Sequence, residues 1–243
     1  MTENQYARTQ VLLGREGMER LAASRVAVFG IGGVGSFAAE ALARCGIGAL
    51  DLFDSDTVSR TNLNRQLIAL HSTIGQPKVE VMAQRIRDID PNIQVTPHAV
   101  FYTAENAGQF PLEPYDYIVD AIDTVSSKLL LVERAQAAGV PILCSMGTGN
   151  KLDPSRFVIT DITRTSVCPL ARVMRRELKK RGIAHCKVLY STEEPRPPMD
   201  ESGEEIPQGK RAIPASISFV PSCAGLMIAG EVVRDLSGVS LGR

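Results

Sequence analysis

The feature that most constrains the fold is a glycine-rich turn at residues 30–35, which reads Gly-Ile-Gly-Gly-Val-Gly. The β-branched and aromatic run Arg25–Phe29 before it predicts a buried strand, and the alanine-rich stretch 36–45 after it predicts a helix packed close to a sheet. In a strand–turn–helix unit of this kind, the amides at the helix N-terminus bind phosphate. Asp54 follows Gly35 by 19 residues and ends the next predicted strand, where an acid that binds ribose is usual. The sequence therefore predicts a nucleotide site built from Gly30, Gly32, Gly33, Gly35 and Asp54, against the alternative of a glycine turn without a ligand.

Short apolar runs and helical stretches alternate through the first half of the chain. This order predicts an α/β fold, Rossmann-like, with a doubly wound and mainly parallel sheet. The second half is less regular, and 192–214 reads as a long mobile loop within one domain that spans residues 1–243. We expect a nucleotide-binding half over 20–150 and a substrate-side half over 151–243. The predicted strands are 25–29, 50–54, 93–95, 117–120, 141–144, 157–159 and 217–220, and the predicted helices are 36–45, 78–90, 126–138, 170–181 and 224–235.

Composition excludes several classes of protein. Lys plus Arg equals Asp plus Glu at 27 each, so any contact with nucleic acid must come from a local patch. The chain has no apolar run long enough to span a membrane and no signal-peptide pattern at its start. Five cysteines stand apart with no Cys-x-x-Cys pair, which argues against a disulfide framework and a zinc site. We therefore expect a cytoplasmic protein that binds no zinc and no membrane.

Two cations follow the second predicted strand. Arg65 lies in the run Asn62-Leu63-Asn64-Arg65-Gln66, and Lys78 begins a predicted helix. The pyrophosphate of a dinucleotide is satisfied by the helix terminus, whereas a triphosphate needs such cations because charge develops on the leaving pyrophosphate. The pair therefore favours ATP over NAD, although each cation alone reads equally well as a surface residue. A dehydrogenase-type or non-catalytic nucleotide-binding module is a further hypothesis for the chain.

These motifs, followed by Val119-Asp120-Ala121-Ile122-Asp123, resemble those of the E1-like superfamily of adenylating enzymes over residues 6–150. The resemblance implies ATP and Mg²⁺ as cofactors, Asp54 on the ribose, and Asn62, Arg65 and Lys78 around the triphosphate. It implies Asp123 as the magnesium ligand, with a helix N-cap as the structural alternative. It also implies that Arg8 reaches the triphosphate of a partner subunit in a homodimer, with a surface cation on a terminal arm as the alternative. The residues expected to act in catalysis are Arg8, Arg65, Lys78 and Asp123.

The second half lacks the two Cys-x-x-Cys pairs of sulfur-carrier enzymes. Its segment 163–176 instead resembles the dehydratases that cyclise threonylcarbamoyladenosine in tRNA, although Cys168 stands where those enzymes usually have Asp. The resemblance implies ATP-dependent dehydration of N6-threonylcarbamoyladenosine through an acyl-adenylate, with tRNA as the partner and a sulfur-transfer protein as a possible second one. Adenylation of the C-terminal glycine of a ubiquitin-like or sulfur-carrier protein is the alternative.

A basic helix in this half supports the tRNA reading. Six cations occur within residues 172–181, with Glu177 as the opposing charge among them. Three- and four-residue spacing places four of the cations on one helical face, where they would neutralise RNA phosphates. The alternative is a solvated helix face. The predicted tRNA contacts are Arg172, Arg175, Arg176 and Lys179.

The remaining reactive side chains are assigned structural roles. Lys128 follows Asp123 by about one helical turn, and we expect it on a solvated face, with a contact to substrate as the alternative. Cys45 and Cys144 fall in apolar elements and are expected in the core, whereas Cys168, Cys186 and Cys223 fall in irregular segments where thiols can be exposed. We predict no catalytic thiol, with His185 beside Cys186 as the one pairing that favours it.

Overall fold

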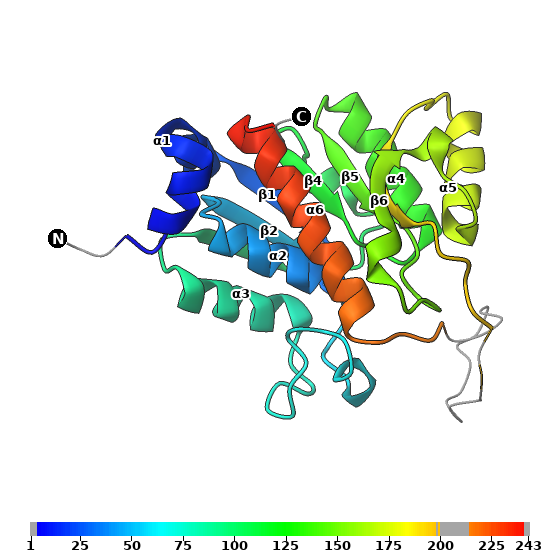
Figure 1. Ribbon diagram of the computed structural model, residues 1–243, viewed down its shortest axis with the longest axis horizontal. Coiled ribbons are helices and arrows are strands. Elements are labelled where there is room, and N and C mark those ends of the chain that lie inside the picture. Colours follow the sequence, from blue (N-terminus) through cyan, green and yellow to red (C-terminus); the bar gives the residue numbers. More distant parts are fainter. Residues whose placement is uncertain (1–3, 198, 200–213, 241–243) are drawn as a thin grey trace.

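The computed structural model describes residues 4–197, 199 and 214–240. A seven-stranded sheet in the order β3-β2-β1-β4-β5-β7-β6 forms its centre (Figure 1). All neighbouring strands are parallel except β6 and β7, which are antiparallel. The prediction of a mainly parallel α/β sheet is therefore confirmed. The strands are β1 (Arg25–Phe29), β2 (Ala49–Phe53), β3 (Gln94–His98), β4 (Tyr117–Asp120), β5 (Ile142–Ser145), β6 (Phe157–Asp161) and β7 (Lys187–Ser191).

Helices cover both faces of this sheet, because successive residues of a strand point to opposite sides. In β1, Val26 and Val28 join one buried cluster with α2, α3 and α6, whereas Ala27 and Phe29 join a second cluster with α4 and α5. The α-helices are α1 (Ala7–Ala23), α2 (Gly35–Arg44), α3 (Lys78–Ile89), α4 (Val125–Ala137), α5 (Pro169–Lys180) and α6 (Phe219–Ser237). The short 3-10 helices are η1 (Arg60–Asn62), η2 (Ala107–Gln109), η3 (Pro154–Arg156) and η4 (Ile162–Arg164). No helix within the described ranges is both long and apolar enough to cross a membrane.

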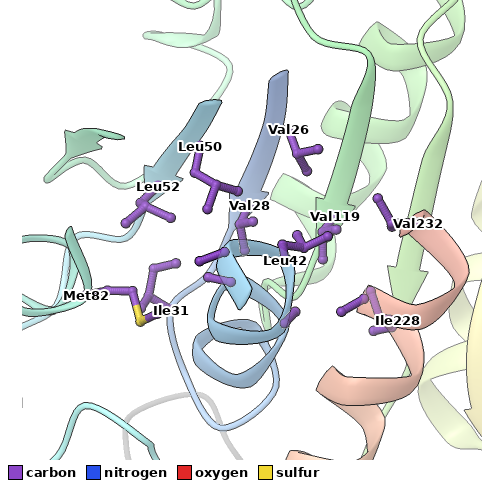
Figure 2. Close-up of a cluster of buried hydrophobic side chains, with 14 of the residues drawn as sticks. Val26, Val28, Ile31, Leu42, Leu50, Leu52, Met82, Val119, Ile228 and Val232 are labelled. Carbon is purple, nitrogen blue, oxygen red and sulfur yellow. The ribbon is translucent and has the colours of Figure 1, made fainter. Parts of the chain in front are cut away.

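The C-terminal helix packs on the N-terminal half. Ile228 and Val232 of α6 are fully buried in one cluster with Leu42 of α2, Val28 of β1 and Val119 of β4 (Figure 2). Burying a side chain of this size contributes about 1.5–3 kcal/mol. The two halves of the sequence therefore share one hydrophobic core.

The structure corrects one predicted strand. The run 217–220 is not a strand, since Phe219 and Val220 open α6. Pro221 explains the difference, because proline fits the first turn of a helix but removes a donor from a sheet ladder. Helix α1 and strand β7 were not predicted. Of the predicted loop 192–214, residues 198 and 200–213 lie outside the described residues, and the others belong to no helix or strand.

Candidate active site

A cavity of about 370 Å³ lies at the carboxyl edge of the sheet, where open α/β sheets bind ligands. The loops that follow β3, β2, β1, β4 and β5, which are neighbours in the sheet in that order, all reach this cavity. Most of the residues that the sequence assigned to ATP line it, namely Gly30, Gly32, Gly33, Asp54, Asn62, Arg65, Lys78 and Asp123. The structure therefore brings together side chains that lie as far as 93 positions apart in the sequence.

The order of the strands fixes the order of the groups around the cavity. Residues 100–102 come from the loop after β3, Asp54 follows β2, and the glycine turn follows β1. Asp123 follows β4, and Thr148 follows β5. A ligand in the cavity would therefore meet an aromatic wall, an acid, backbone amides, a second acid and a hydroxyl in that sequence.

The glycine turn has no room for side chains at two positions. Gly30 has a φ of +90°, and a Cβ there would lie 2.6 Å from the carbonyl oxygen of Ala121. A Cβ on Gly35 would lie 1.7 Å from the carbonyl oxygen of Gly30. Gly35 itself begins α2 and does not line the cavity, so its contribution is the close packing of helix on strand.

Asp54 is tied to the backbone of this turn. Its Oδ2 accepts a hydrogen bond from the amide of Ile31 at 2.7 Å, and its Oδ1 accepts one from the amide of Asp56 at 2.8 Å. Burial raises the pKa of Asp54, and the charge of Lys78 and the two amides offset part of that effect. The carboxyl is thus held rigidly against the glycine turn at the floor of the cavity.

The predicted cations lie in the same cavity. Lys78 is 5% exposed, and its Nζ lies 2.7 Å from Oδ2 of Asp56. Arg65 donates from Nη1 to the carbonyl oxygen of Thr61 and to Oδ1 of Asn64, both at 2.9 Å. Two cations therefore face one space, and an anion there would compete with neutral acceptors for Arg65 and with one carboxylate for Lys78.

Asn62 and Gln66 are buried polar residues beside them. Oδ1 of Asn62 accepts a hydrogen bond from the amide of Ser59 at 3.1 Å, which closes η1. Gln66 is 8% exposed, and its Oε1 has no hydrogen-bond partner within the described part of the chain. Buried polar atoms are normally paired, and Gln66 lines the cavity, so its amide is available to a ligand there; the sequence reading gave it no role.

Asp123 lies exposed at the rim, three residues beyond the end of β4. The N-cap of α4 is Thr124, so the structural alternative for Asp123 is not the one that occurs. No group of three or more His, Cys, Asp or Glu residues that could hold a metal occurs among the described residues. Mg²⁺ usually keeps several waters and takes one or two carboxylates with substrate phosphates, so a single acid beside a phosphate site fits it.

Lys128 is a correction to the sequence reading. It is fully buried rather than solvated, and its Nζ lies 2.9 Å from Oδ2 of Asp120, itself fully buried. The same ammonium donates to the carbonyl oxygens of Ile122 at 3.1 Å and Asp120 at 3.5 Å. Lysine is seldom fully buried unless it is paired, and here the pair ties α4 to the segment that carries Asp123.

The predicted tRNA residues lie on α5, outside the cavity. Arg172, Arg176 and Lys179, here called the basic face, are exposed. Arg175 is half-buried and donates from Nη1 to Oγ1 of Thr165 at 2.6 Å. A side chain on Gly147 would meet Sγ of Cys168 at 3.8 Å, so α5 begins at the same edge of the sheet as the cavity.

Three thiols are in the core, which corrects the expectation for two of them. Cys168 and Cys186 are 2% and 5% exposed, and Cys144 is fully buried as predicted. The contact with Cys186, at 3.7 Å between the sulfur atoms, and burial raise the pKa of Cys144. His185 contacts Asp161 through Nδ1 at 3.3 Å. None of these three thiols lines the cavity.

Arg8 lies on α1, exposed and outside the cavity of its own chain. The sequence reading also missed the aromatic side of the cavity, which Phe29, Phe53, Phe101 and Tyr102 form. Phe101 is 52% exposed. The available signal was that 100–102 follow the predicted strand 93–95, although by five residues, because loops after parallel strands meet at the carboxyl edge.

Comparison with known proteins agrees with this geometry. The ThiF family matches residues 3–242. The tRNA threonylcarbamoyladenosine dehydratase of Bacillus subtilis is 45% identical over 240 residues, which cover 96% of this chain and 94% of that protein. The crystal structure of the Escherichia coli tRNA N6-threonylcarbamoyladenosine dehydratase in complex with ATP superposes with a TM-score of 0.86 and 33% identity, covering 96% of this chain and 94% of that one.

A more distant relative matches less of the chain. The sulfur carrier protein adenylyltransferase of Thermus thermophilus is 34% identical over 142 residues, which cover 58% of this chain and 52% of that protein. The glycine turn, the paired cations and the rim acid thus occur in a chain that one family matches almost from end to end. With a relative 45% identical over nearly its whole length, this chain belongs to the ThiF family, the E1-like group that its motifs resemble.

Proposed function

We propose that this protein is an ATP-dependent tRNA threonylcarbamoyladenosine dehydratase, which cyclises N6-threonylcarbamoyladenosine in tRNA. The observation that carries the proposal is the match to the Bacillus subtilis dehydratase over 96% of this chain, which includes the substrate-side half. The solved Escherichia coli dehydratase holds ATP in a fold that superposes on this one with a TM-score of 0.86. ATP is therefore the nucleotide we assign to the cavity.

The order of groups around the cavity supports one orientation of ATP. Asp54 would bind the ribose, and the amides of the glycine turn would bind phosphate at the N-terminus of α2. Asn62, Arg65 and Lys78 would surround the triphosphate, with the two cations stabilising the charge that develops on pyrophosphate. Asp123 would hold Mg²⁺, which supplies charge neutralisation at the phosphates.

The chemistry has two steps. A carboxylate oxygen of the threonylcarbamoyl group attacks the α-phosphorus, a new oxygen–phosphorus bond forms, and the bond to pyrophosphate breaks. The carbamoyl group of the same side chain then attacks the acyl carbon, loses its proton to solvent and expels AMP. Because this second attack is intramolecular, its effective molarity is high and it needs no protein nucleophile. The net change is loss of one water from the nucleoside at the expense of ATP.

The tRNA would lie along α5. The basic face is exposed, and α5 begins beside the loop that carries Thr148 to the cavity. Its cations would bind RNA phosphates without reading sequence. Because the substrate is tRNA, we place the protein in the cytoplasm.

A homodimer would complete the site. Arg8 lies on α1 away from the cavity of its own chain, and the same helix exposes Val11 and Leu12 by 86% and 79%. We propose that these two side chains pack against a second copy and that Arg8 reaches the triphosphate of the partner. The exposed apolar pair on α1 supports this proposal of two composite sites.

The test is mass spectrometry of tRNA nucleosides after incubation with protein, ATP and magnesium. The expected product is lighter than N6-threonylcarbamoyladenosine by one water, with AMP and pyrophosphate formed in equal amounts. Pyrophosphate exchange that responds to a sulfur-carrier or ubiquitin-like protein, and not to this tRNA, would instead favour the alternative function. The match to the carrier adenylyltransferase covers 58% of this chain, which makes that alternative the weaker one.

A further inference from the structure

Lys151 is a buried cation without a carboxylate among its described neighbours. The residue is 4% exposed, and the one hydrogen bond of its ammonium within the described part of the chain reaches the carbonyl oxygen of Gly149 at 3.4 Å. The other buried lysines, Lys78 and Lys128, each have an acid within 2.9 Å of the ammonium. A buried charge is costly unless it is paired, so an ammonium that no described carboxylate neutralises is a candidate to bind an anion.

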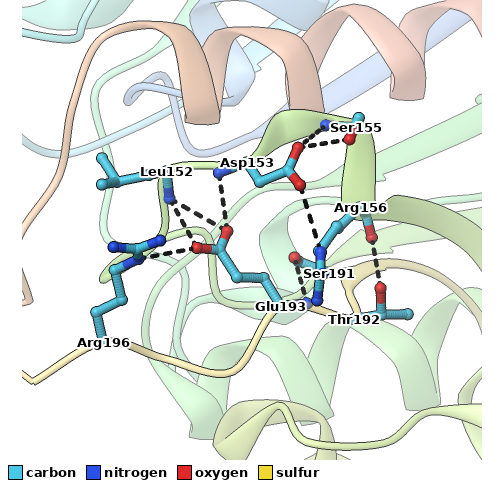
Figure 3. Close-up of polar contacts among 8 residues, drawn as sticks. All are labelled: Leu152, Asp153, Ser155, Arg156, Ser191, Thr192, Glu193 and Arg196. Carbon is cyan, nitrogen blue, oxygen red and sulfur yellow. Dashed lines mark hydrogen bonds and ion pairs between the residues drawn. The ribbon is translucent and has the colours of Figure 1, made fainter.

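Glu193 is the acid that binds the backbone just after Lys151, and other donors already occupy its carboxylate. Glu193 accepts hydrogen bonds from the amides of Leu152 and Asp153, at 3.1 Å and 2.9 Å, and from Nε of Arg196 at 3.3 Å (Figure 3). Burial opposes ionisation of Glu193, but these donors outweigh it and lower its pKa. Glu193 therefore fixes the backbone just after Lys151 and does not neutralise its side chain.

The position of Lys151 points to the substrate side of the cavity. Its Nζ folds back to Gly149, the neighbour of Thr148, which lines the cavity. A side chain on Gly149 would meet Pro214 at 2.9 Å, and Asn150 holds Ala215 through two hydrogen bonds of 2.7 and 2.8 Å, next to Ser216, which also lines the cavity. Lys151 does not itself line the cavity, but its segment runs on directly from Thr148 after β5, which in the order of the strands lies beyond Asp123 and farther from Asp54.

We propose that Lys151 binds the carboxylate of the threonylcarbamoyl side chain before it is adenylated. The proposal rests on the proposed function, in which a carboxylate must approach the α-phosphate from outside the triphosphate clamp. A buried ammonium in that place pairs with the carboxylate, orients it and releases it once the charge is lost to the anhydride. The site selects a substrate that carries an anion, and a neutral side chain leaves Lys151 unpaired.

Binding of RNA tests the assignment without turnover. The ligands are an anticodon stem-loop that carries threonylcarbamoyladenosine, its methyl ester, and the unmodified RNA. Lys151→Met should weaken binding of the acid roughly 10- to 100-fold, the usual range for a hydrogen bond to a charged group. Binding of the ester, the unmodified RNA and ATP should match wild type, and Lys151→Arg should restore part of the preference for the acid. The control is Lys187→Met, which removes a lysine paired with Glu231 and Asp235 on neighbouring β7 and should keep the preference.

Thermal unfolding separates binding from a structural role. Removing an unpaired buried charge should leave the melting temperature of Lys151→Met at or above that of wild type. A lower melting temperature with an unchanged preference for the acid would make Lys151 structural and overturn the proposal, and so would a loss of ATP affinity, which would make it a phosphate ligand. Cyclisation by the wild-type protein is measured in parallel. If the wild-type protein does not cyclise the nucleoside, the proposed function is wrong. If the wild-type protein cyclises it but Lys151→Met keeps the wild-type preference for the acid over the ester, only the inference about Lys151 is wrong.

Discussion

The buried pair of Lys128 and Asp120 gives the sharpest prediction. Both side chains are fully buried, 2.9 Å apart, and the ammonium also serves two carbonyl oxygens at the end of β4. In Lys128→Met, the carboxylate keeps one donor, the amide of Ile122 at 3.1 Å. The variant therefore leaves the buried carboxylate of Asp120 without a counter-charge, at the base of the loop that carries Asp123.

The expected cost is large. Removing one partner of a buried ion pair typically destabilises a protein by about 3–5 kcal/mol, against a total stability of about 5–15 kcal/mol. Asp120→Asn added to Lys128→Met removes the stranded charge but keeps an acceptor for Ile122, so the double variant should recover about 1–2 kcal/mol. The recovery, rather than the loss alone, identifies charge as the cause.

Urea denaturation followed by circular dichroism measures both values. Lys187→Met is the matched control, because Lys187 is likewise a lysine paired with acids, Glu231 and Asp235, but its side chain is 34% exposed. Solvent screens such a pair, so its loss should cost about 1 kcal/mol or less. The reasoning is refuted if the two single variants lose equal stability, or if the double variant is no more stable than Lys128→Met.

Four further predictions concern the site. Asp123→Asn should keep the free energy of unfolding near wild type but reduce magnesium-dependent pyrophosphate release to background; normal release would exclude the metal role. Lys78→Ala should cost roughly 3 kcal/mol of transition-state stabilisation in kcat/KM for pyrophosphate release, as for loss of one preorganised donor, and an unchanged rate would remove it from the triphosphate clamp. Arg8→Ala subunits, inactive alone, should regain activity when mixed with Asp123→Asn subunits, and failure after verified subunit exchange would contradict a shared site. Replacing the basic face by Ala should flatten the salt dependence of tRNA binding by roughly 0.9 log units per decade of salt for each lost duplex contact, with ATP affinity unchanged; coincident slopes would show a merely solvated face.

The sequence predicted the nucleotide-binding half well because its signals are local. The glycine turn and Asp54 are identified by short spacings between a strand, a turn and a helix, and those spacings carry the geometry with them. Asp123 follows from the same logic, since it comes shortly after a strand whose carboxyl end must reach the same edge. The strand order of the sheet then brings these residues to one cavity without further information.

The predictions that failed depend on contacts between distant residues. Lys128 reads as solvated because lysine usually is, and its burial depends on how α4 packs against the end of β4. The run 217–220 is apolar and short, and periodicity alone cannot separate a strand from the start of a buried helix. Strand β7 pairs with β5 from 44 positions away, so no local pattern announces it. Lys151 went unnoticed because nothing in its neighbouring sequence shows that it is buried.

The packing of α6 on the first half has a consequence for biosynthesis. A chain still on the ribosome that has emerged only through β5 has most of the residues that line the cavity, but it lacks Ile228 and Val232. The apolar surface of Val28, Leu42 and Val119 that they cover would then face water or a chaperone. We therefore expect a nascent chain to acquire affinity for ATP only after residues 219–237 have left the exit tunnel. On this view, α6 must be synthesised and packed before the nucleotide cavity in the first half of the chain is stable.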